Sequence, residues 1–109
     1  MWVTSRLRIG NKEAFFGPGT REFLLKIEEF GSIKKAAETM KLSYTKALKM
    51  IRAMDEELGF PVVASEKGGK IHGKTTLTEQ GKLVLEKYIE IEREVTLLAE
   101  KLVEEKFRF

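Results

Sequence analysis

Apolar residues at the start of the chain alternate with polar ones from Val3 to Ile9, which is the period of a β-strand. A short polar turn follows, and a second strand is expected over residues 13–16. From residue 18 the apolar spacing changes to three and four positions, the period of an amphipathic helix, until a glycine at position 31. This pattern predicts an N-terminal β-hairpin followed by a first helix.

Two further helices are marked by their capping residues. Ser32 can cap a short helix over 33–40, and Ser43 can cap a longer helix over 44–58. Both assignments rest on the serine hydroxyl, which accepts a hydrogen bond from the free N–H groups of a first helical turn. Gly59 follows the longer helix, where a glycine cap is favoured. The short connection between the two helices predicts a helix-turn-helix.

The rest of the chain predicts a second hairpin and one long helix. Short apolar strands are expected over 62–65 and 75–77, joined by a loop over 67–74 that is rich in glycine and lysine. Thr78 then caps a final helix whose pattern reaches Phe107.

Three helices followed by a two-stranded hairpin form the winged helix-turn-helix arrangement. The predicted fold class is therefore mostly α with small β, a winged helix-turn-helix with an N-terminal β-hairpin and a long C-terminal dimerisation helix. Residues 1–77 would form the DNA-binding domain with its wing, and residues 78–109 the dimerisation helix of the same structural unit. A chain of 109 residues suits one such domain.

Composition excludes several kinds of site. The absence of cysteine and the single histidine exclude disulfides, cysteine-ligated zinc and a histidine-cluster metal site, so we expect no metal and no cofactor. No apolar run approaches the roughly 20 residues that span a bilayer, and the start lacks the apolar segment of a signal peptide. The sequence thus indicates a soluble, cytoplasmic protein without a membrane partner.

Charge is unevenly distributed, although the net charge is only +3. Residues 31–54 carry six lysines and arginines against one glutamate. Residues 83–106 carry seven glutamates against four lysines and arginines. The middle of the chain is therefore expected to meet a polyanion, and the end is not. A solvated helix face is the alternative explanation for any single charge run.

The helix predicted over 44–58 has the features of a helix that reads DNA. Apolar residues would dock it on the core, namely Leu48, Ile51 and Met54. The outward side chains at its start all donate hydrogen bonds and none is acidic: Ser43, Tyr44, Thr45, Lys46 and Lys49. Such side chains can approach base edges in the major groove. An ordinary helical hairpin is the alternative interpretation.

The loop over 67–74 is interpreted as a DNA-contacting wing. Its cations Lys67, Lys70 and Lys74 would neutralise phosphates. Residues 68–75 also match the G-x-x-x-x-G-K-T pattern of nucleotide-binding P-loops, but a P-loop needs a helix that begins at its Lys-Thr pair, and a strand is expected here. His72 is expected to be an exposed polar residue or a phosphate contact. A hairpin that touches nothing is the alternative.

The final helix carries an apolar seam whose steps alternate between three and four residues, as in a coiled coil. The seam consists of Val84, Tyr88, Ile91, Val95, Leu98 and Leu102. A helix from Thr78 to Phe107 would be about 45 Å long, which is more than a domain of this size can cover. We therefore expect a homodimer through this helix. Packing of the helix back on its own domain is the alternative.

The helix-turn-helix resembles two families of regulators. Its similarity to the N-terminal DNA-binding domain of molybdate-responsive ModE regulators rests on Gly31-Ser32-Ile33, Ala36-Ala37, Ser43-Tyr44, Ala47, Ile51 and Met54. Its similarity to LysR-type regulators extends through Glu56-Glu57-Leu58-Gly59, Gly68-Gly69 and Leu77-Thr78-Glu79-Gln80-Gly81. The leading hairpin fits the ModE type better than the LysR type.

The resemblance implies a dimeric regulator with its recognition helix in the major groove. By position, Ser32 and Lys34 would hold phosphates, residues 43–49 would enter the groove, and the wing would flank the site. Regulators of both families continue into effector domains, whereas this sequence ends at Phe109. The resemblance therefore does not carry over molybdate sensing, and no small-molecule effector is evident.

Together these patterns favour a sequence-specific regulator of transcription that is not an enzyme. It would bind double-stranded DNA as a homodimer, with helix 44–58 in the major groove and wing 67–74 on the flanking backbone. The alternative is a winged-helix module that binds another protein without binding DNA.

Overall fold

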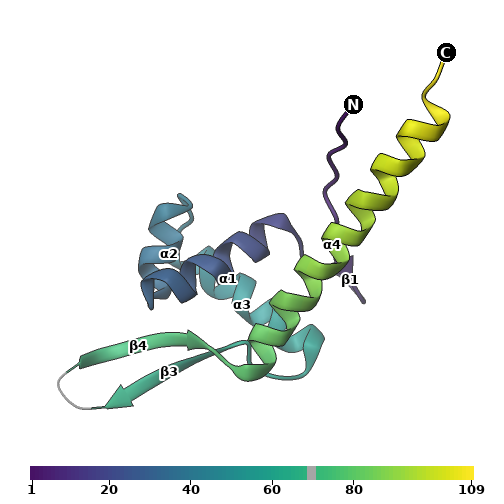
Figure 1. The fold of residues 1–109 in the computed structure, drawn as a ribbon. Coiled ribbons are helices and arrows are strands. Elements are labelled where there is room, and N and C mark those ends of the chain that lie inside the picture. Colours follow the sequence, from purple (N-terminus) through teal and green to yellow (C-terminus); the bar gives the residue numbers. More distant parts are fainter. Residues whose placement is uncertain (69–70) are drawn as a thin grey trace.

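The computed structural model describes residues 1–68 and 71–109, and their side chains except at 66–68 and 71–73 (Figure 1). Two small antiparallel hairpins and four helices make up this part of the chain. In chain order the elements are β1 (Ile9–Gly10), β2 (Ala14–Phe16), α1 (Pro18–Phe30), α2 (Ile33–Thr39), α3 (Tyr44–Leu58), β3 (Val63–Gly68), β4 (Ile71–Leu77) and α4 (Glu79–Lys106). The predicted winged helix-turn-helix with a long C-terminal helix is confirmed.

The helices begin and end where the sequence predicts caps. Ser32, Ser43 and Thr78 each accept a hydrogen bond from the backbone N–H three residues later, at 2.9 to 3.1 Å. Gly31 and Gly59 take φ values of 65° and 82°, which suit glycine because it lacks a Cβ. Local chemistry therefore fixes the ends of α1 and α3 and the starts of α2, α3 and α4.

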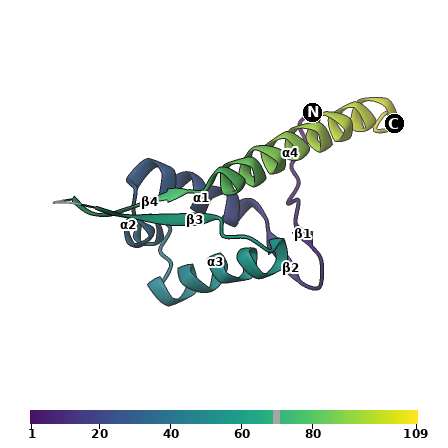
Figure 2. The same cartoon turned by 90° about the horizontal axis from the view of Figure 1, so that it is seen from below.

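The predicted strand from Val3 to Ile9 is wrong over residues 3–8. The ladder contains only Ile9 opposite Phe16 and Gly10 opposite Ala14. Residues 3–8 have no partner strand, because β2 ends at Phe16 and α1 begins at Pro18. We call residues 1–8 the N-terminal arm; it lies in extended form beside α4 in both views (Figures 1 and 2).

The wing strands are longer than the sequence predicts. β3 and β4 pair antiparallel, with Val63 opposite Leu77 and Glu66 opposite Lys74. Most of the expected loop over 67–74 therefore belongs to strands. Lys74 and Thr75 lie within β4, so no helix begins at the Lys-Thr pair and the P-loop alternative is wrong.

The core lies where α1, α2 and α3 meet the base of the wing and the first turns of α4. Ile51 and Met54 dock α3 as predicted, whereas Leu48 is only partly buried. Phe30, the last residue of α1, is 38% exposed, and the Lys26 ammonium lies 5.9 Å from the centre of its ring. The buried apolar side chains are Phe16, Phe23, Leu24, Ile27, Ala36, Ala37, Ala47, Ile51, Met54, Val62, Leu77, Leu85 and Tyr88.

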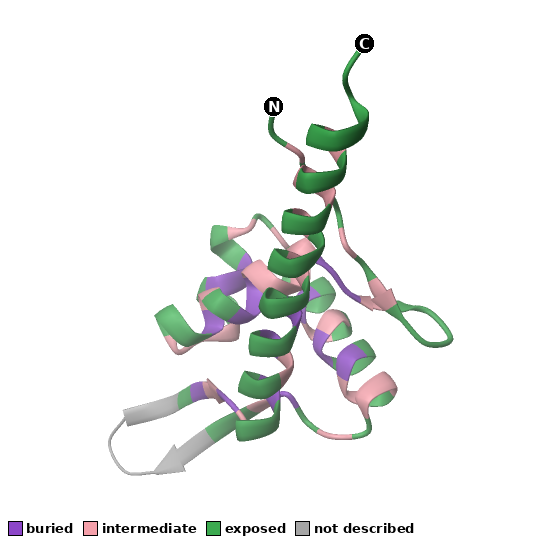
Figure 3. Cartoon of the chain, turned by 45° about the vertical axis from the view of Figure 1, so that its right-hand side comes forward, coloured by how far each residue is buried: buried purple, intermediate pink, exposed green. Residues whose placement is uncertain are grey.

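α4 extends well beyond this core. It contains 28 residues, and its length gives the molecule principal extents of 64, 27 and 24 Å. Figure 2 shows the helix leaving the domain on the side opposite the wing. Figure 3 shows that most of the projecting half is exposed. Only the first turns of α4 therefore belong to the domain core.

Candidate nucleic-acid interface

α3 presents one polar face to solvent. Ala47, Ile51 and Met54 are buried on its opposite side and fix its rotation. This orientation exposes all five side chains that the sequence assigns to base recognition, namely Ser43, Tyr44, Thr45, Lys46 and Lys49. Among the described residues neither of the two lysines forms an ion pair, so their charges are available to an anionic partner.

Two further residues lie on this face and were missed by the sequence reasoning. Arg52 and Ala53 are exposed and follow Lys49 by three and four positions, the spacing that keeps residues on one side of a helix. The same periodicity that selected Lys46 and Lys49 could have found them. Arg52 adds a cation, and the methyl group of Ala53 suits the methyl group of thymine.

Ser32 and Lys34 lie at the start of α2. The Ser32 hydroxyl accepts a hydrogen bond from the Lys35 backbone N–H at 3.1 Å and keeps its own proton to donate. Lys34 and Lys35 are both exposed. This end of α2 therefore presents hydroxyl and ammonium donors side by side, and Lys35 is an addition to the predicted set.

The wing is attached directly next to the start of α2. The Thr75 N–H donates a hydrogen bond to the Gly31 carbonyl at 2.9 Å. The aliphatic stem of Lys74 crosses over Gly31, where an added Cβ would lie 3.1 Å from the Lys74 Cγ. Lys74 is thereby brought near Ser32. Lys70 lies outside the described residues, as do the side chains of Lys67 and His72.

The predicted seam on α4 is divided between two environments. Tyr88 is 1% exposed and packs against Phe16 at 4.7 Å between ring centroids, so its side chain is not available to a partner. Val84 is partly buried on the same domain. The remaining four seam residues are 38 to 57% exposed, namely Ile91, Val95, Leu98 and Leu102.

A sequence profile of the lysR family of bacterial regulatory helix-turn-helix proteins matches residues 21–82, which is more than half of the chain. The chain belongs to the lysR family. The matched residues include α2, α3, the wing and the start of α4. The residues that the sequence assigns to base recognition and the start of α2 therefore all fall inside the matched segment.

Relatives of this lysR-family chain include a transcriptional regulator and a molybdenum-pterin-binding protein. The transcriptional regulator ModE of Haemophilus influenzae is 34% identical over 79 residues, which cover 72% of this chain and 31% of ModE. The molybdenum-pterin-binding protein MopB of Rhodobacter capsulatus is 39% identical over 75 residues, 69% of this chain and 28% of MopB. The predicted resemblance to ModE and LysR-type regulators is confirmed.

Part of a solved LysR family transcriptional regulator has the same fold as this lysR-family chain. The two align with a TM-score of 0.56 and 19% identity, over 82% of this chain and 29% of the other. The chain thus spans less than a third of the length of the relatives it matches.

One polar network of this lysR-family domain is structural. The Tyr88 hydroxyl donates to the Leu7 carbonyl at 2.7 Å and lies 3.5 Å from Glu92, which in turn is paired with Arg21. Burial raises the pKa of Tyr88, and the Glu92 carboxylate adds to this effect. The network joins the arm, α1 and α4.

Two other features, a metal site and a membrane-spanning helix, are absent from the described part of this lysR-family domain. Among the residues whose side chains the structure describes, 1–65 and 74–109, no group of three acidic or histidine side chains could hold a metal ion. The same part of the chain contains no helix with the length and apolarity that crossing a membrane requires.

Proposed function

We propose that this lysR-family domain binds double-stranded DNA in a sequence-specific manner and regulates transcription, with α3 in the major groove and the wing on the flanking backbone. The observation that carries the proposal is the exposed face of α3. Every predicted recognition side chain on it is exposed and donates hydrogen bonds, while the opposite face is held in the core. Over residues 43–52 this face is a run of donors without any carboxylate, which a surface that binds another protein would not require.

The proposed contacts divide into two kinds. Side chains near the start of α2 and on the wing contact phosphates and set affinity: Ser32, Lys34, Lys67, Lys70 and Lys74. Side chains at the start of α3 contact base edges and set sequence preference: Ser43, Tyr44, Thr45, Lys46 and Lys49. The wing contact with Gly31 supports this division, because Lys74 lies beside the start of α2 and not beside the start of α3.

We also propose that the domain acts as a homodimer through α4. Ile91, Val95, Leu98 and Leu102 form an exposed apolar strip at heptad spacing, and a second copy would cover it. Tyr88 is not part of this surface, because it is buried in its own domain. A two-fold dimer would also present two recognition helices to two related half-sites.

Charges beside the strip favour an antiparallel pair of helices. If Val95 packs against Leu98 of the second copy, then Glu94 faces Lys101 of the second copy, and this attraction occurs twice. In a parallel pair, Lys101 would instead face Lys106 of the second copy, and the two cations would repel each other. The antiparallel register therefore suits both the apolar strip and its flanking charges.

The proposal is tested by titrating salt against binding to mixed duplexes of about 30 base pairs, with selection of tight binders. We expect log affinity to fall steeply with log salt concentration, by about 0.9 for each neutralised phosphate, and a palindromic site to be enriched. Absent or salt-independent binding would contradict the DNA proposal and favour the alternative, a module that binds another protein.

A further inference from the structure

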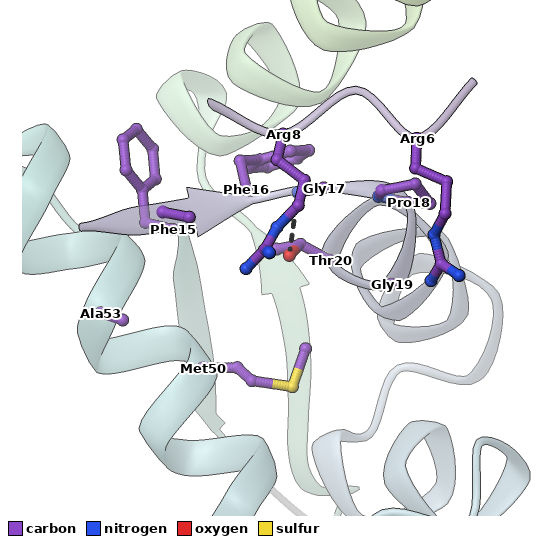
Figure 4. A pocket seen from close by; sticks show the side chains of 11 residues that line it. Arg6, Arg8, Phe15, Phe16, Gly17, Pro18, Gly19, Thr20, Met50 and Ala53 are labelled. Atoms are coloured by element: carbon purple, nitrogen blue, oxygen red, sulfur yellow. Dashed lines mark hydrogen bonds between the residues drawn. The ribbon is translucent and has the colours of Figure 1, made fainter. Parts of the chain in front are cut away.

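A cavity of about 530 Å³ lies beside the middle of α3 (Figure 4). Its walls are the N-terminal arm, the β2–α1 junction and two residues of α3, Met50 and Ala53. The arm contributes Arg6 and Arg8, whose guanidinium groups both extend from the arm toward the cavity (Figure 4). The lining contains no acidic side chain.

The position of Arg8 follows from how the arm is held. The Leu7 carbonyl accepts the Tyr88 hydrogen bond at 2.7 Å, which fixes the backbone between the two arginines. The stem of Arg8 then crosses Gly17, where an added Cβ would lie 3.5 Å from its Cγ. The arm thus carries its two cations to the start of α1, and neither forms an ion pair among the residues that the structure describes.

Two groups of side chains that can bind phosphate lie at opposite ends of α1. Arg6 and Arg8 flank the first residues of α1, whereas Ser32, Lys34 and Lys74 adjoin Gly31 after its last residue. A helix of 13 residues is about 20 Å long. A major groove is about 12 Å wide and has a phosphate chain on each side, so flexible cationic side chains at both ends of α1 can reach across it.

We propose that Arg6 and Arg8 bind backbone phosphates of the DNA strand that lies opposite the one held by α2 and the wing. This inference rests on the proposed function and extends it with a second phosphate contact, so that α3 is held from both sides. DNA is favoured over a small anion as the ligand because the cavity opens beside Ala53, on the exposed face of α3 that carries the recognition side chains.

The test compares two double variants that remove the same charge. R6A/R8A empties the cavity of cations, and K12A/R108A removes two exposed cations that lie outside it. We expect R6A/R8A to lower the slope of log affinity against log salt by about 0.9 per lost contact, equally for selected and random duplexes. K12A/R108A should leave the slope unchanged, and circular dichroism should show that both variants fold.

A second measurement locates the contact on the DNA. Uncharged methylphosphonate groups are placed one at a time along each strand of the selected duplex. In each half-site, groups at the phosphates held by α2 and the wing should weaken binding of the unmodified protein and of R6A/R8A alike. One position or two adjacent positions on the strand opposite those phosphates should weaken binding of the unmodified protein and have no further effect on R6A/R8A. Additive losses at every position would overturn the inference.

The outcomes separate this inference from the proposal on which it rests. If the unmodified protein binds no duplex, both fail. If it binds DNA and R6A/R8A behaves like K12A/R108A, only the arginine contact fails. Titration with inorganic phosphate tests whether the cavity binds a small anion instead of DNA. If phosphate binding depends on the two arginines while the salt slope for DNA is unchanged in R6A/R8A, the cavity binds a small anion and the DNA contact is overturned.

Discussion

The hydroxyl of Tyr88 donates a hydrogen bond to the backbone carbonyl of Leu7 at 2.7 Å, across 81 positions of the sequence. This bond holds the N-terminal arm against α4 in place of a β-ladder. The same tyrosine packs its ring on Phe16 in β2. Tyr88 therefore connects α4 to the two N-terminal segments that line the arginine cavity.

Removal of the Tyr88 hydroxyl should weaken the fold in a pH-dependent way. Tyr88→Phe leaves the Leu7 carbonyl without its donor and should lower the free energy of unfolding by about 1 kcal/mol at neutral pH. Because burial raises the pKa of Tyr88 above its ordinary 10.0, the folded state holds this proton more tightly than the unfolded state. The stabilisation is thus full below pH 10 and is lost as pH rises through the folded pKa.

Urea unfolding of the parent and of Tyr88→Phe between neutral pH and pH 11 checks this prediction. The difference between the two proteins should shrink as the pH rises above about 10. A difference that stays constant across the range would show that the hydroxyl does not titrate as its buried position requires.

Gly81 is required by a close approach between α4 and the chain before β3. A Cβ added there would lie 2.1 Å from the Val62 carbonyl oxygen, which is backbone and cannot turn aside. Gly81→Ala should therefore lower the free energy of unfolding by about 1–3 kcal/mol, as overpacking does. The matched control is Gly19→Ala in α1, where nothing lies within 4 Å and alanine should be neutral or stabilising.

The helices could be predicted from the sequence because their signals are local. Ser32, Ser43 and Thr78 cap the helices that they precede, and each cap acts within three residues of its own position. The strand expected over Val3–Ile9 failed because a strand needs a partner, and β2 is only three residues long. Alternation alone carries no information about that partner.

The sites were predictable only in part, because sequence patterns are local and a site also joins residues that are distant in the sequence. Lys46 and Lys49 lie on one helix, so periodicity places them together. Arg8 and Ala53 line one cavity although they are far apart in the sequence, and no local pattern brings them together. Tyr88 was predicted to lie on the dimer surface, but it is buried in its own domain. Heptad spacing identifies an apolar face of a helix, but it does not distinguish packing on the same chain from packing on a second copy.

Two lysines should separate sequence reading from phosphate binding. Lys49→Ala should relax the preference at a single base pair, at a cost of about 1–3 kcal/mol for the preferred duplex. Lys74→Ala should weaken binding to all duplexes alike and reduce the salt slope by about 1. Competition binding with a set of single-base-pair variants of the selected site measures both effects. Equal losses for the two lysines would contradict the proposed division of roles.

The antiparallel dimer can be tested by cysteine cross-linking, because the sequence contains no native cysteine that could interfere. In the proposed register Ile91 faces Leu102 of the second copy. The double variant I91C/L102C should therefore form disulfide-linked dimers under mild oxidation. The two cysteines cannot pair within one chain, because 11 helical residues separate their Cα atoms by about 16 Å and a disulfide tolerates less than about 7 Å.

The single variants I91C and L102C serve as controls for the register. In an antiparallel pair each cysteine lies about 16 Å from its own counterpart, so neither variant should cross-link. A parallel pair reverses both expectations, since each residue then meets its counterpart and the single variants cross-link as readily as the double variant. If no variant cross-links while sedimentation shows a dimer, the copies associate through a surface other than the α4 strip. The Glu94 and Lys101 contact would then have no role in assembly.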